Sequence, residues 1–522
     1  MIKNNNKKLV SLIVFSFFMA APAYAGQSKY DDKISQLIAI INKQSQQIQS
    51  LEKRMGQIES RKVYVKKVTY NKKQNEDASV VRRINYSGTP EESIRFHDPY
   101  AERAESNNYF EKLFGYSARD NKSTTQVNGL ILKWGNGIPA ITTENGDYSF
   151  RLRGRILADY GSSFGSRFHN LNVSRTMMRA ARIGAEGRIK QLSWVIESDF
   201  SSNSLVLMSA YATWTTKTFG HVAEYTLGHK FSERGFDGST GSYNTVFLDR
   251  DLVATTLVPV MGWYGLGGAY KIYGNNWHVA TQIAGDQVNN VNMKNNIRDD
   301  ITYLARAHYI PFRNNTYLLH LGIWGYYEDV KPAQNFTQDI EALSRTNNNF
   351  NLQFGPTAPL AHSFAGGLEL FGMRKSMWAL VEFGARRMTL RRTSGIASSS
   401  TDFAGMTGTV RAFSAQYGVF LTGEKPNYMP RNGVWGLPHV LHPVIDGGMG
   451  AWELAFRWDW ANSSHVFSGA DAWTLTAGLN WYLMSTAHLM FNYTHAHVYN
   501  ATGDYIGSNS GDTFGARVAV IF

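Results

Sequence analysis

The sequence predicts an all-β protein: a sixteen-stranded antiparallel transmembrane β-barrel, preceded by a short N-terminal α-helical coiled coil. Three observations support this prediction. The 522 residues include 47 Gly and 13% aromatic residues but only 18% charged residues. The mean hydropathy of −0.31 is too low for a bundle of membrane helices. Segments with strand periodicity follow one another from residue 148 to the C-terminus, as in a barrel with a wet lumen and a lipid-facing surface.

The first 25 residues have the pattern of a secretory signal peptide. Lys3, Lys7 and Lys8 form a basic start, residues 9–21 are an apolar run, and a small-residue cleavage site ends at Ala25. We expect cleavage after Ala25 and export of the rest of the chain. A single membrane anchor is the alternative, although a span requires ~20 apolar residues.

Residues 26–60 are predicted to form a coiled coil on the periplasmic side. Apolar residues recur every seven positions over four heptads, the repeat that supercoiled helices require. One core position holds Ile34, Ile41, Ile48 and Met55, and the other holds Leu37, Leu51 and Ile58 together with one polar residue, Gln44. The alternative is a single amphipathic helix lying on a neighbouring surface.

Residues 61–147 are predicted as a linker and pre-barrel segment. Residues 61–73 contain several basic residues and no acidic one, and no period is sustained as far as residue 126. We interpret this stretch as a solvated linker, able to touch an acidic polymer or an anionic surface. A short apolar piece at residues 130–134 is expected to lie below the barrel.

Residues 148–522 are predicted to form the barrel, because apolar and polar side chains alternate along one segment after another. Alternate side chains of a strand point to opposite faces. In the last segment, one face holds Phe514, Ala516, Val518, Val520 and Phe522. A soluble sandwich would show the same alternation. These segments, however, approach the ~10 residues of a transmembrane strand and have aromatic residues near their ends.

The predicted strands number sixteen, and single-chain bacterial barrels have an even number. They lie near residues 148–160, 177–187, 190–200, 205–215, 222–231, 265–273, 276–285, 301–310, 317–326, 363–371, 377–390, 409–421, 450–460, 473–484, 488–498 and 513–522. With both chain ends in the periplasm, long external loops alternate with short periplasmic turns. Two connections break this rule: the external one after residue 200 is short, and the periplasmic one at 422–449 is long.

Eight short sequence stretches follow one another along residues 148–522, and their order carries a family resemblance. They are FRLRGR at 150–155 with Asp159, residues 179–187 with Arg182 and Gly184, LGHKF at 227–231, HLG at 320–322, FLTGE at 420–424, GAWEL at 450–454, LNWY at 479–482, and the terminal Phe522. In this order they resemble the phosphate-selective porin O and P family, many members of which have a coiled coil before the barrel. The resemblance implies a trimeric porin in the outer membrane of a Gram-negative bacterium and passive diffusion of anions, classically phosphate. It also implies that the barrel assembly machinery reads Phe522.

The opening strand is predicted to present a ladder of guanidinium groups to the lumen. Arg151, Arg153 and Arg155 alternate with apolar residues, and residues two apart lie ~6.6 Å from each other along a strand. A guanidinium binds anion oxygens through a planar fork, and a ladder of weak sites lets an anion pass. The same reasoning places in the lumen Arg182, Arg306, Arg386, Arg457 and Arg517. The alternative is pairing with lumen carboxylates, for which Glu186, Glu197, Asp199, Glu382 and Glu453 are available.

The third external loop, residues 232–264, is predicted to fold inward and narrow the pore, with Lys230, Arg234 and Arg250 at or within it. In phosphate-binding members of the family, lysines from the third and fifth external loops gather at the constriction. Here loop 232–264 contains no Lys, and loop 327–362 contains only Lys331. The prediction is therefore a general preference for anions rather than tight selectivity for phosphate.

Enzymatic function, cofactors, metal ions and nucleic-acid partners are not expected. The chain has no cysteine, which excludes disulfide scaffolds, thiol catalysis and Cys-based zinc sites. It also lacks the His-Glu-x-x-His pattern.

The predicted function is passive diffusion of small anions, with phosphate or polyphosphate as candidate solutes, through a porin of the cell outer membrane. The expected partners are the permeating anions, outer-membrane lipid, the barrel assembly machinery and further copies of the chain in a homotrimer. Three alternatives stay open: an envelope tether that uses the coiled coil and basic linker, a general non-selective porin, and an outer-membrane hydrolase.

Overall fold

The computed structural model of the chain describes residues 124–127, 130–135, 138–143, 145–202, 204–288, 299–314, 316–331, 336–392 and 404–522. The predicted signal peptide and coiled coil, residues 1–60, lie outside the described residues. Within these ranges, no helix has both the length and the apolarity that crossing a membrane requires.

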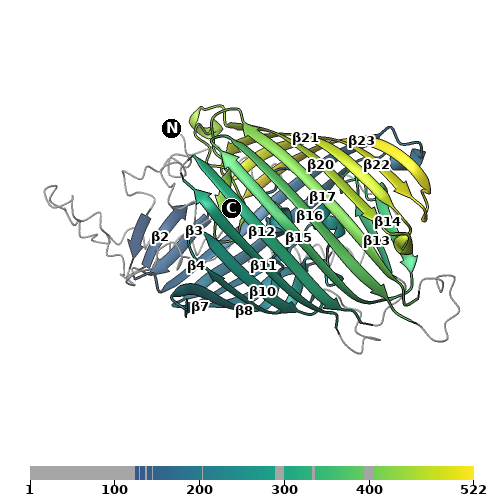
Figure 1. Ribbon diagram of the computed structural model, residues 1–522. Coiled ribbons are helices and arrows are strands. Elements are labelled where there is room, and N and C mark those ends of the chain that lie inside the picture. Colours follow the sequence, from purple (N-terminus) through teal and green to yellow (C-terminus); the bar gives the residue numbers. More distant parts are fainter. Residues whose placement is uncertain are drawn as a thin grey trace, which may run out of the picture. The chain divides into compact units, whose positions relative to one another are not determined.

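Sixteen antiparallel strands form a closed barrel (Figure 1). They are β4 (Tyr148–Phe164), β5 (Ser174–Ile189), β6 (Leu192–Asp199), β7 (Val206–Thr218), β8 (His221–Phe231), β9 (Tyr264–Tyr273), β10 (Trp277–Ala284), β11 (Ile301–Arg313), β12 (Tyr317–Asp329), β15 (Leu360–Arg374), β16 (Met377–Leu390), β17 (Thr407–Phe420), β20 (Ala451–Ser463), β21 (Asp471–Met484), β22 (Ala487–Asn500) and β23 (Gly507–Ile521). The last strand pairs with the first, from Asp512 opposite Phe164 to Ile521 opposite Arg155, which closes the ring. The predicted all-β barrel of sixteen strands is confirmed.

Side chains alternate between the two faces of the barrel wall, as predicted. On β16, Trp378, Glu382 and Arg386 point inward, and each is only 1% exposed. Met377 and Phe383 of the same strand point outward and are 47% and 42% exposed. Apolar side chains therefore cover the outside, where a bilayer would contact them, and polar side chains line the inside.

The connections differ in length at the two ends of the barrel. Lys190, Phe219 and Lys375 take left-handed φ angles of 53°, 52° and 53° in three of the tight turns, a backbone conformation that tight hairpin turns require. The short turns are residues 190–191, 219–220, 274–276, 314–316, 375–376 and 485–486. Both predicted exceptions are observed. Residues 200–205 form a short link at the long-loop end, and residues 421–450 form a long connection at the short-turn end.

A meander of three short strands precedes the barrel. It consists of β1 (Thr124–Val127), β2 (Leu130–Gly135) and β3 (Ile138–Thr143), and β3 pairs with the first residues of β4. β1 begins within the stretch that shows no sustained period in the sequence, because a four-residue strand is too short to show one. The apolar piece at residues 130–134 lies in β2, which pairs with β1 and β3 rather than with a barrel strand.

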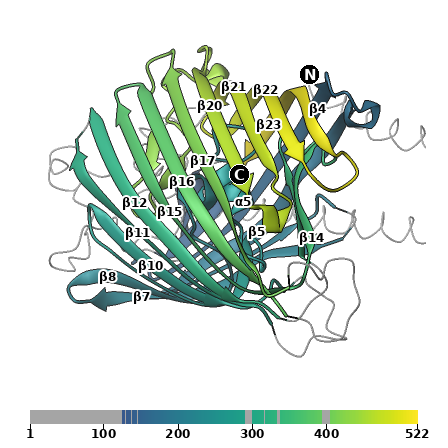
Figure 2. The ribbon, with the colours of Figure 1, turned by 45° about the vertical axis from the view of Figure 1, so that its right-hand side comes forward.

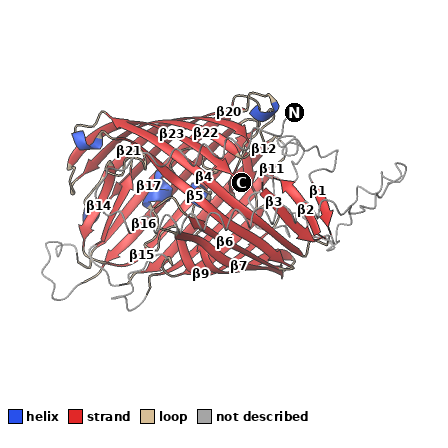
Figure 3. Cartoon of the chain, turned by 180° about the vertical axis from the view of Figure 1, so that it is seen from behind, coloured by secondary structure: helices blue, strands red, loops and turns tan. Residues whose placement is uncertain are grey.

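Three inserts enter the barrel, because a ring of sixteen strands is too wide for its own side chains to fill. The first, the inward loop (residues 232–263), contains α4 (Phe236–Ser239) and α5 (Leu252–Thr256), and Figure 2 shows α5 inside the ring. The second is the pair β13 (Phe336–Glu341) and β14 (Asn351–Thr357). The third, the inner hairpin (residues 427–436), contains β18 (Asn427–Met429) and β19 (Val434–Gly436) and comes from the short-turn end. The helices are few and short beside the strands (Figure 3).

The C-terminal residue completes the barrel by pairing with Gly154. Gly154 N–H donates to the Phe522 carbonyl oxygen at 2.6 Å, and Phe522 N–H donates to the Gly154 carbonyl oxygen at 3.0 Å. The phenyl ring lies so close that a Cβ at position 154 would come within 2.3 Å of it.

Gly154→Val is therefore expected to displace the terminal ring. Like deletion of Phe522, it should lower the amount of folded, heat-modifiable protein in the outer membrane, because the aromatic terminus can no longer dock. Gly372→Val is the matched control, since a Cβ there meets nothing closer than 3.9 Å. Equal amounts of folded Gly154→Val and Gly372→Val protein would contradict this role of Phe522.

Candidate pore constriction

Side chains of the opposite wall hold the inward loop inside the barrel. Glu382 on β16 accepts hydrogen bonds from the N–H groups of Phe236 and Asp237, at 2.7 and 2.9 Å. The buried ring of Phe236 packs against Phe371 of β15 and Trp435 of the inner hairpin, with centroids 5.0 and 5.4 Å away. The loop thus crosses the lumen and narrows it, as the sequence predicts.

Two arginines of the inward loop lie against aromatic rings. The guanidinium carbons of Arg234 and Arg250 are 4.9 and 4.6 Å from the centre of the Trp263 ring. Arg234 donates to the Ala254 carbonyl at 2.9 Å, and neither arginine forms an ion pair within the described ranges. Burial lowers the pKa of Arg234 to about 10 and also lowers the pKa of Arg250. A buried cation without a carboxylate is destabilised, so an anion beside it is favoured.

The predicted arginine ladder lines the lumen, but carboxylates balance its charge. Arg151 and Arg153 bind the two oxygens of Glu186, at 2.5 and 2.9 Å. Arg153 and Arg155 bind one oxygen of Glu197, at 3.3 and 2.7 Å. A guanidinium removed from bulk water needs such a partner to offset its lost hydration. The ladder is therefore a wall of ion pairs rather than a row of free cations.

Most other predicted lumen cations are balanced in the same way. Arg182 binds Asp199 at 2.7 Å and Glu197 at 3.4 Å. The remaining pairs are Lys230–Glu233, Arg306–Glu369, Arg386–Glu328, Arg457–Asp459 and Arg517–Asp159. Only Arg234 and Arg250 of the predicted set do not contact a carboxylate in the described part of the chain.

Arg179 on β5 is a lumen cation that was not predicted from the sequence. Strict alternation along this strand would point it toward lipid. The pairing of β4 with β5 shifts between Leu157 and Ala158, which face Ala180 and Met178 and leave Arg179 as the extra residue of a bulge. Arg179 therefore faces the lumen, while Met178 is 44% exposed outside. Its Nε is buried without a hydrogen-bond partner, and none of the described carboxylates pairs with it.

A cavity of about 360 Å³ lies between the inward loop and the wall formed by β4 to β9. Its lining carboxylates are Glu197, Glu233, Asp249 and Glu341. Among its lining cations, Arg179 and Arg250 form no ion pair with the described carboxylates, and Arg345 forms only a long one, 3.9 Å from Glu341. Met429, Asn432 and Val434 of the inner hairpin also line it. Seven Arg and Lys side chains line the cavity against these four carboxylates, so the net charge of the lining is positive.

A sequence model of the family "Phosphate-selective porin O and P" matches residues 150–352 and 401–522, more than half of the chain. The chain belongs to this family of outer-membrane porins. The resemblance found in the sequence is thereby confirmed, and the family is one of channels rather than enzymes. This places the porin in the outer membrane of Gram-negative bacteria, where such barrels have short periplasmic turns and longer external loops.

Several solved structures are similar to this porin in fold. OmpT of Vibrio cholerae shares 7% sequence identity over 72% of this chain and 98% of its own, with a TM-score of 0.44. An anion-selective porin from Comamonas acidovorans shares 12% identity over 72% of this chain and 100% of its own, with a TM-score of 0.40. The channel DcaP of Acinetobacter baumannii shares 11% identity over 72% of this chain and 98% of its own, with a TM-score of 0.40. The comparison with curated proteins found no match.

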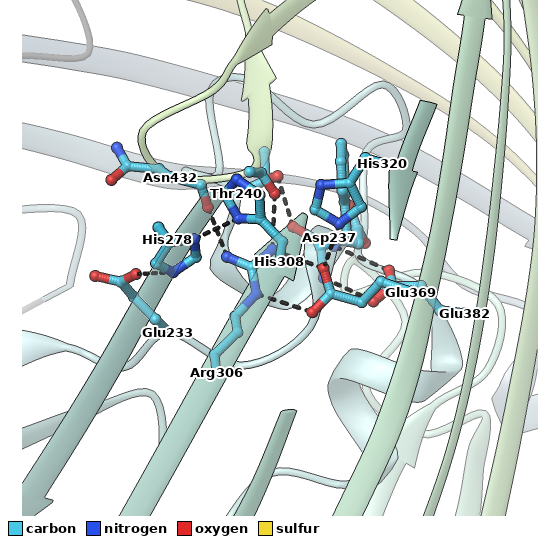
Figure 4. A network of polar contacts seen from close by, with 12 residues as sticks. Glu233, Asp237, Thr240, His278, Arg306, His308, His320, Glu369, Glu382 and Asn432 are labelled. Atoms are coloured by element: carbon cyan, nitrogen blue, oxygen red, sulfur yellow. Dashed lines mark hydrogen bonds and ion pairs between the residues drawn. The ribbon is translucent and has the colours of Figure 1, made fainter. Parts of the chain in front are cut away.

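The inner hairpin of the porin belongs to the connection at the periplasmic end of the barrel. Arg306 anchors it inside the lumen (Figure 4). Arg306 donates to the carbonyl oxygens of Asn432 and Gly433, at 2.6 and 2.7 Å. Its other donors bind both oxygens of Glu369, at 2.8 and 2.7 Å. Lys271 donates to the side-chain oxygen of Asn432 at 2.7 Å. One charged cluster therefore links the barrel wall to the hairpin backbone.

Three histidines of neighbouring strands pack beside this anchor (Figure 4). The His308 ring lies 4.2 Å from His278 and 4.8 Å from His320, measured between ring centres. His320 is 3.2 Å from Glu369 and 2.7 Å from the hydroxyl of Tyr428 in the inner hairpin. The described residues contain no group of three His, Asp or Glu side chains arranged to hold a metal ion. The cluster thus supports the hairpin.

Proposed function

We propose that this porin passes small anions by passive diffusion, with Arg179, Arg250 and Arg345 providing the charge preference. The observation that carries the proposal is Arg179, which lines the cavity with a buried, unpartnered Nε and forms no ion pair among the described residues. Cations that lack a fixed carboxylate attract mobile anions into a confined lumen, whereas an ion pair of the wall attracts them weakly.

General anion preference is better supported than a dedicated phosphate site. Lys331, the lysine available in the loop after β12, pairs with Asp286 and lies 3.9 Å from Asp300. It does not line the cavity. A phosphate site needs several donors converging on a small oxyanion, and no lysine of either external loop supplies one here.

We also propose that the porin works as a homotrimer, as the family resemblance implies. OmpT of Vibrio cholerae has a trimer form among its solved structures. The coiled coil predicted at residues 26–60 would add a periplasmic contact between copies.

The reversal potentials of Arg179→Gln and Asp249→Asn test the proposed charge preference. Asp249 also lines the cavity. Although burial raises its pKa, the guanidinium groups of Arg517, Arg345 and Arg179 lower it, so the carboxylate stays ionised. We expect Arg179→Gln to weaken chloride preference and Asp249→Asn to strengthen it. Each should change the permeability ratio severalfold at 0.1 M salt, where the Debye length is ~10 Å.

The control for these variants is Asp446→Asn, at an exposed residue of the periplasmic connection. It should leave the reversal potential unchanged. Shifts of the same sign in Arg179→Gln and Asp249→Asn, or shifts no larger than that of the control, would overturn the proposed role of the cavity.

A further inference from the structure

One side of the cavity is aromatic. Phe231 ends β8, Tyr264 begins β9, and Trp263 directly precedes it; all three are half-buried and line the cavity. The rings of Phe231 and Trp263 are stacked, with centroids 6.0 Å apart and an interplanar angle of 7°. Tyr264 meets Phe231 edge-on, with centroids 5.1 Å apart. These rings form a continuous apolar surface on one side of a cavity whose other lining residues are largely polar or charged.

Arginine lies directly on this aromatic surface. The Arg250 guanidinium is 4.6 Å from the centre of the Trp263 ring and 5.6 Å from that of Phe231. Arg250 is held there by the carbonyl oxygens of Asp237 and Thr240, at 3.2 and 2.5 Å. The cavity thus combines a fixed cation and aromatic faces, and Arg179 lines the same space.

The size of the cavity exceeds what an inorganic oxyanion needs. Its volume of about 360 Å³ lies in the range of small-molecule pockets, roughly 300–1,000 Å³. Small-molecule pockets combine apolar walls with a few placed polar groups, and this cavity has both. A carboxylate can meet Arg179 or Arg250 while an attached ring lies against Trp263 or Tyr264.

We propose that this cavity binds organic anions with a planar apolar part, such as aromatic carboxylates, and that the porin admits them in preference to inorganic phosphate. The inference rests on the proposed anion preference and specifies the solute class. The aromatic surface provides the selectivity for the ring, and the unbalanced guanidinium groups provide the selectivity for the charge.

Block of chloride current through single porins in planar bilayers tests this inference. Sodium benzoate, sodium acetate, sodium phosphate and benzylammonium chloride are added in turn at constant ionic strength. We expect benzoate to block at lower concentration than acetate or phosphate, and benzylammonium to block least. Trp263→Leu should weaken benzoate block by about 2- to 10-fold, the range expected for one aromatic pair, and leave acetate block unchanged. Trp263→Phe should retain most of the benzoate block.

The matched control is Trp458→Leu, because Trp458 is 45% exposed on the outer face of the barrel. Equal block by benzoate and acetate in the wild type would overturn the inference, as would unchanged benzoate block in Trp263→Leu. Stronger block by benzylammonium than by benzoate would also overturn it. These failures leave chloride selectivity in a KCl gradient intact, whereas loss of that selectivity would overturn the proposed function itself.

Discussion

Replacing the inner hairpin, residues 427–436, by a short Gly-Ser turn should raise the single-channel conductance severalfold. The hairpin contributes Met429, Asn432 and Val434 to the cavity lining. Its Trp435 meets Phe236 of the inward loop, which enters from the external end. The two inserts therefore close the lumen from opposite sides, and removing one leaves an open path beside the other.

The geometry of the hairpin makes this replacement feasible. Asn427 and Gly436 are cross-strand partners, so a short turn can join the flanking residues without moving the barrel strands. The matched control replaces residues 444–447, which belong to the same connection but are exposed. Conductance in planar bilayers should rise only when residues 427–436 are replaced. Equal conductance of both variants would show that the hairpin does not restrict the pore.

Glu197→Gln should lower the free energy of unfolding by about 3–5 kcal/mol, the cost of removing one partner of a buried ion pair. Glu197 is 3% exposed. It pairs with Arg153, Arg155 and Arg182, at 3.3, 2.7 and 3.4 Å. The neutral amide removes the carboxylate that Arg155 pairs with, and it leaves Arg153 and Arg182 with Glu186 and Asp199 as their remaining partners. Urea-induced unfolding of the barrel in lipid vesicles, followed by tryptophan fluorescence, measures the effect.

Glu341→Gln serves as the control for this prediction. Glu341 lies 3.9 Å from Arg345, and the two side chains are 30% and 38% exposed. An exposed ion pair of this kind contributes only about 0–1 kcal/mol. Similar unfolding free energies for Glu197→Gln and Glu341→Gln would mean that the ladder of ion pairs does not stabilise the wall.

The barrel could be predicted from the sequence because its wall has lipid on one side and a wet lumen on the other. Apolar and polar side chains therefore alternate along each strand. On β20, Glu453, Arg457 and Asp459 point inward, while Phe456 and Trp458 are 50% and 45% exposed outside. This pattern depends only on neighbours along the chain, so it is visible in one sequence. The strand boundaries also predicted the long periplasmic connection at 422–449. The length of that connection, however, does not indicate that part of it folds into the lumen.

The lumen charges depend on contacts between distant strands, and these could not be predicted. Arg155 on β4 meets Glu197 on β6 across β5, so their pairing depends on the register of three strands. Arg179 is the extra residue of a bulge, and the local sequence pattern does not reveal that bulge. Without the bulge, Arg179 lies an odd number of residues from the lumen-facing Arg182 and would face lipid. Most of the lumen cations predicted from the sequence therefore pair with carboxylates, whereas Arg179, which has no such pair among the described residues, was not predicted.

The sign of the reversal potential in a KCl gradient shows directly whether the pore prefers anions or cations. The wild-type porin in a planar bilayer, with less than 0.1 M KCl on the dilute side, should show a potential set mainly by chloride. The reason is that Arg179 and Arg250 line the cavity without an ion pair to any described carboxylate, and Arg345 has only a long, partly exposed one with Glu341. Screening is weakest at low salt, so the preference should grow as salt falls. A reversal potential set by potassium would rule out the proposed anion preference of the pore.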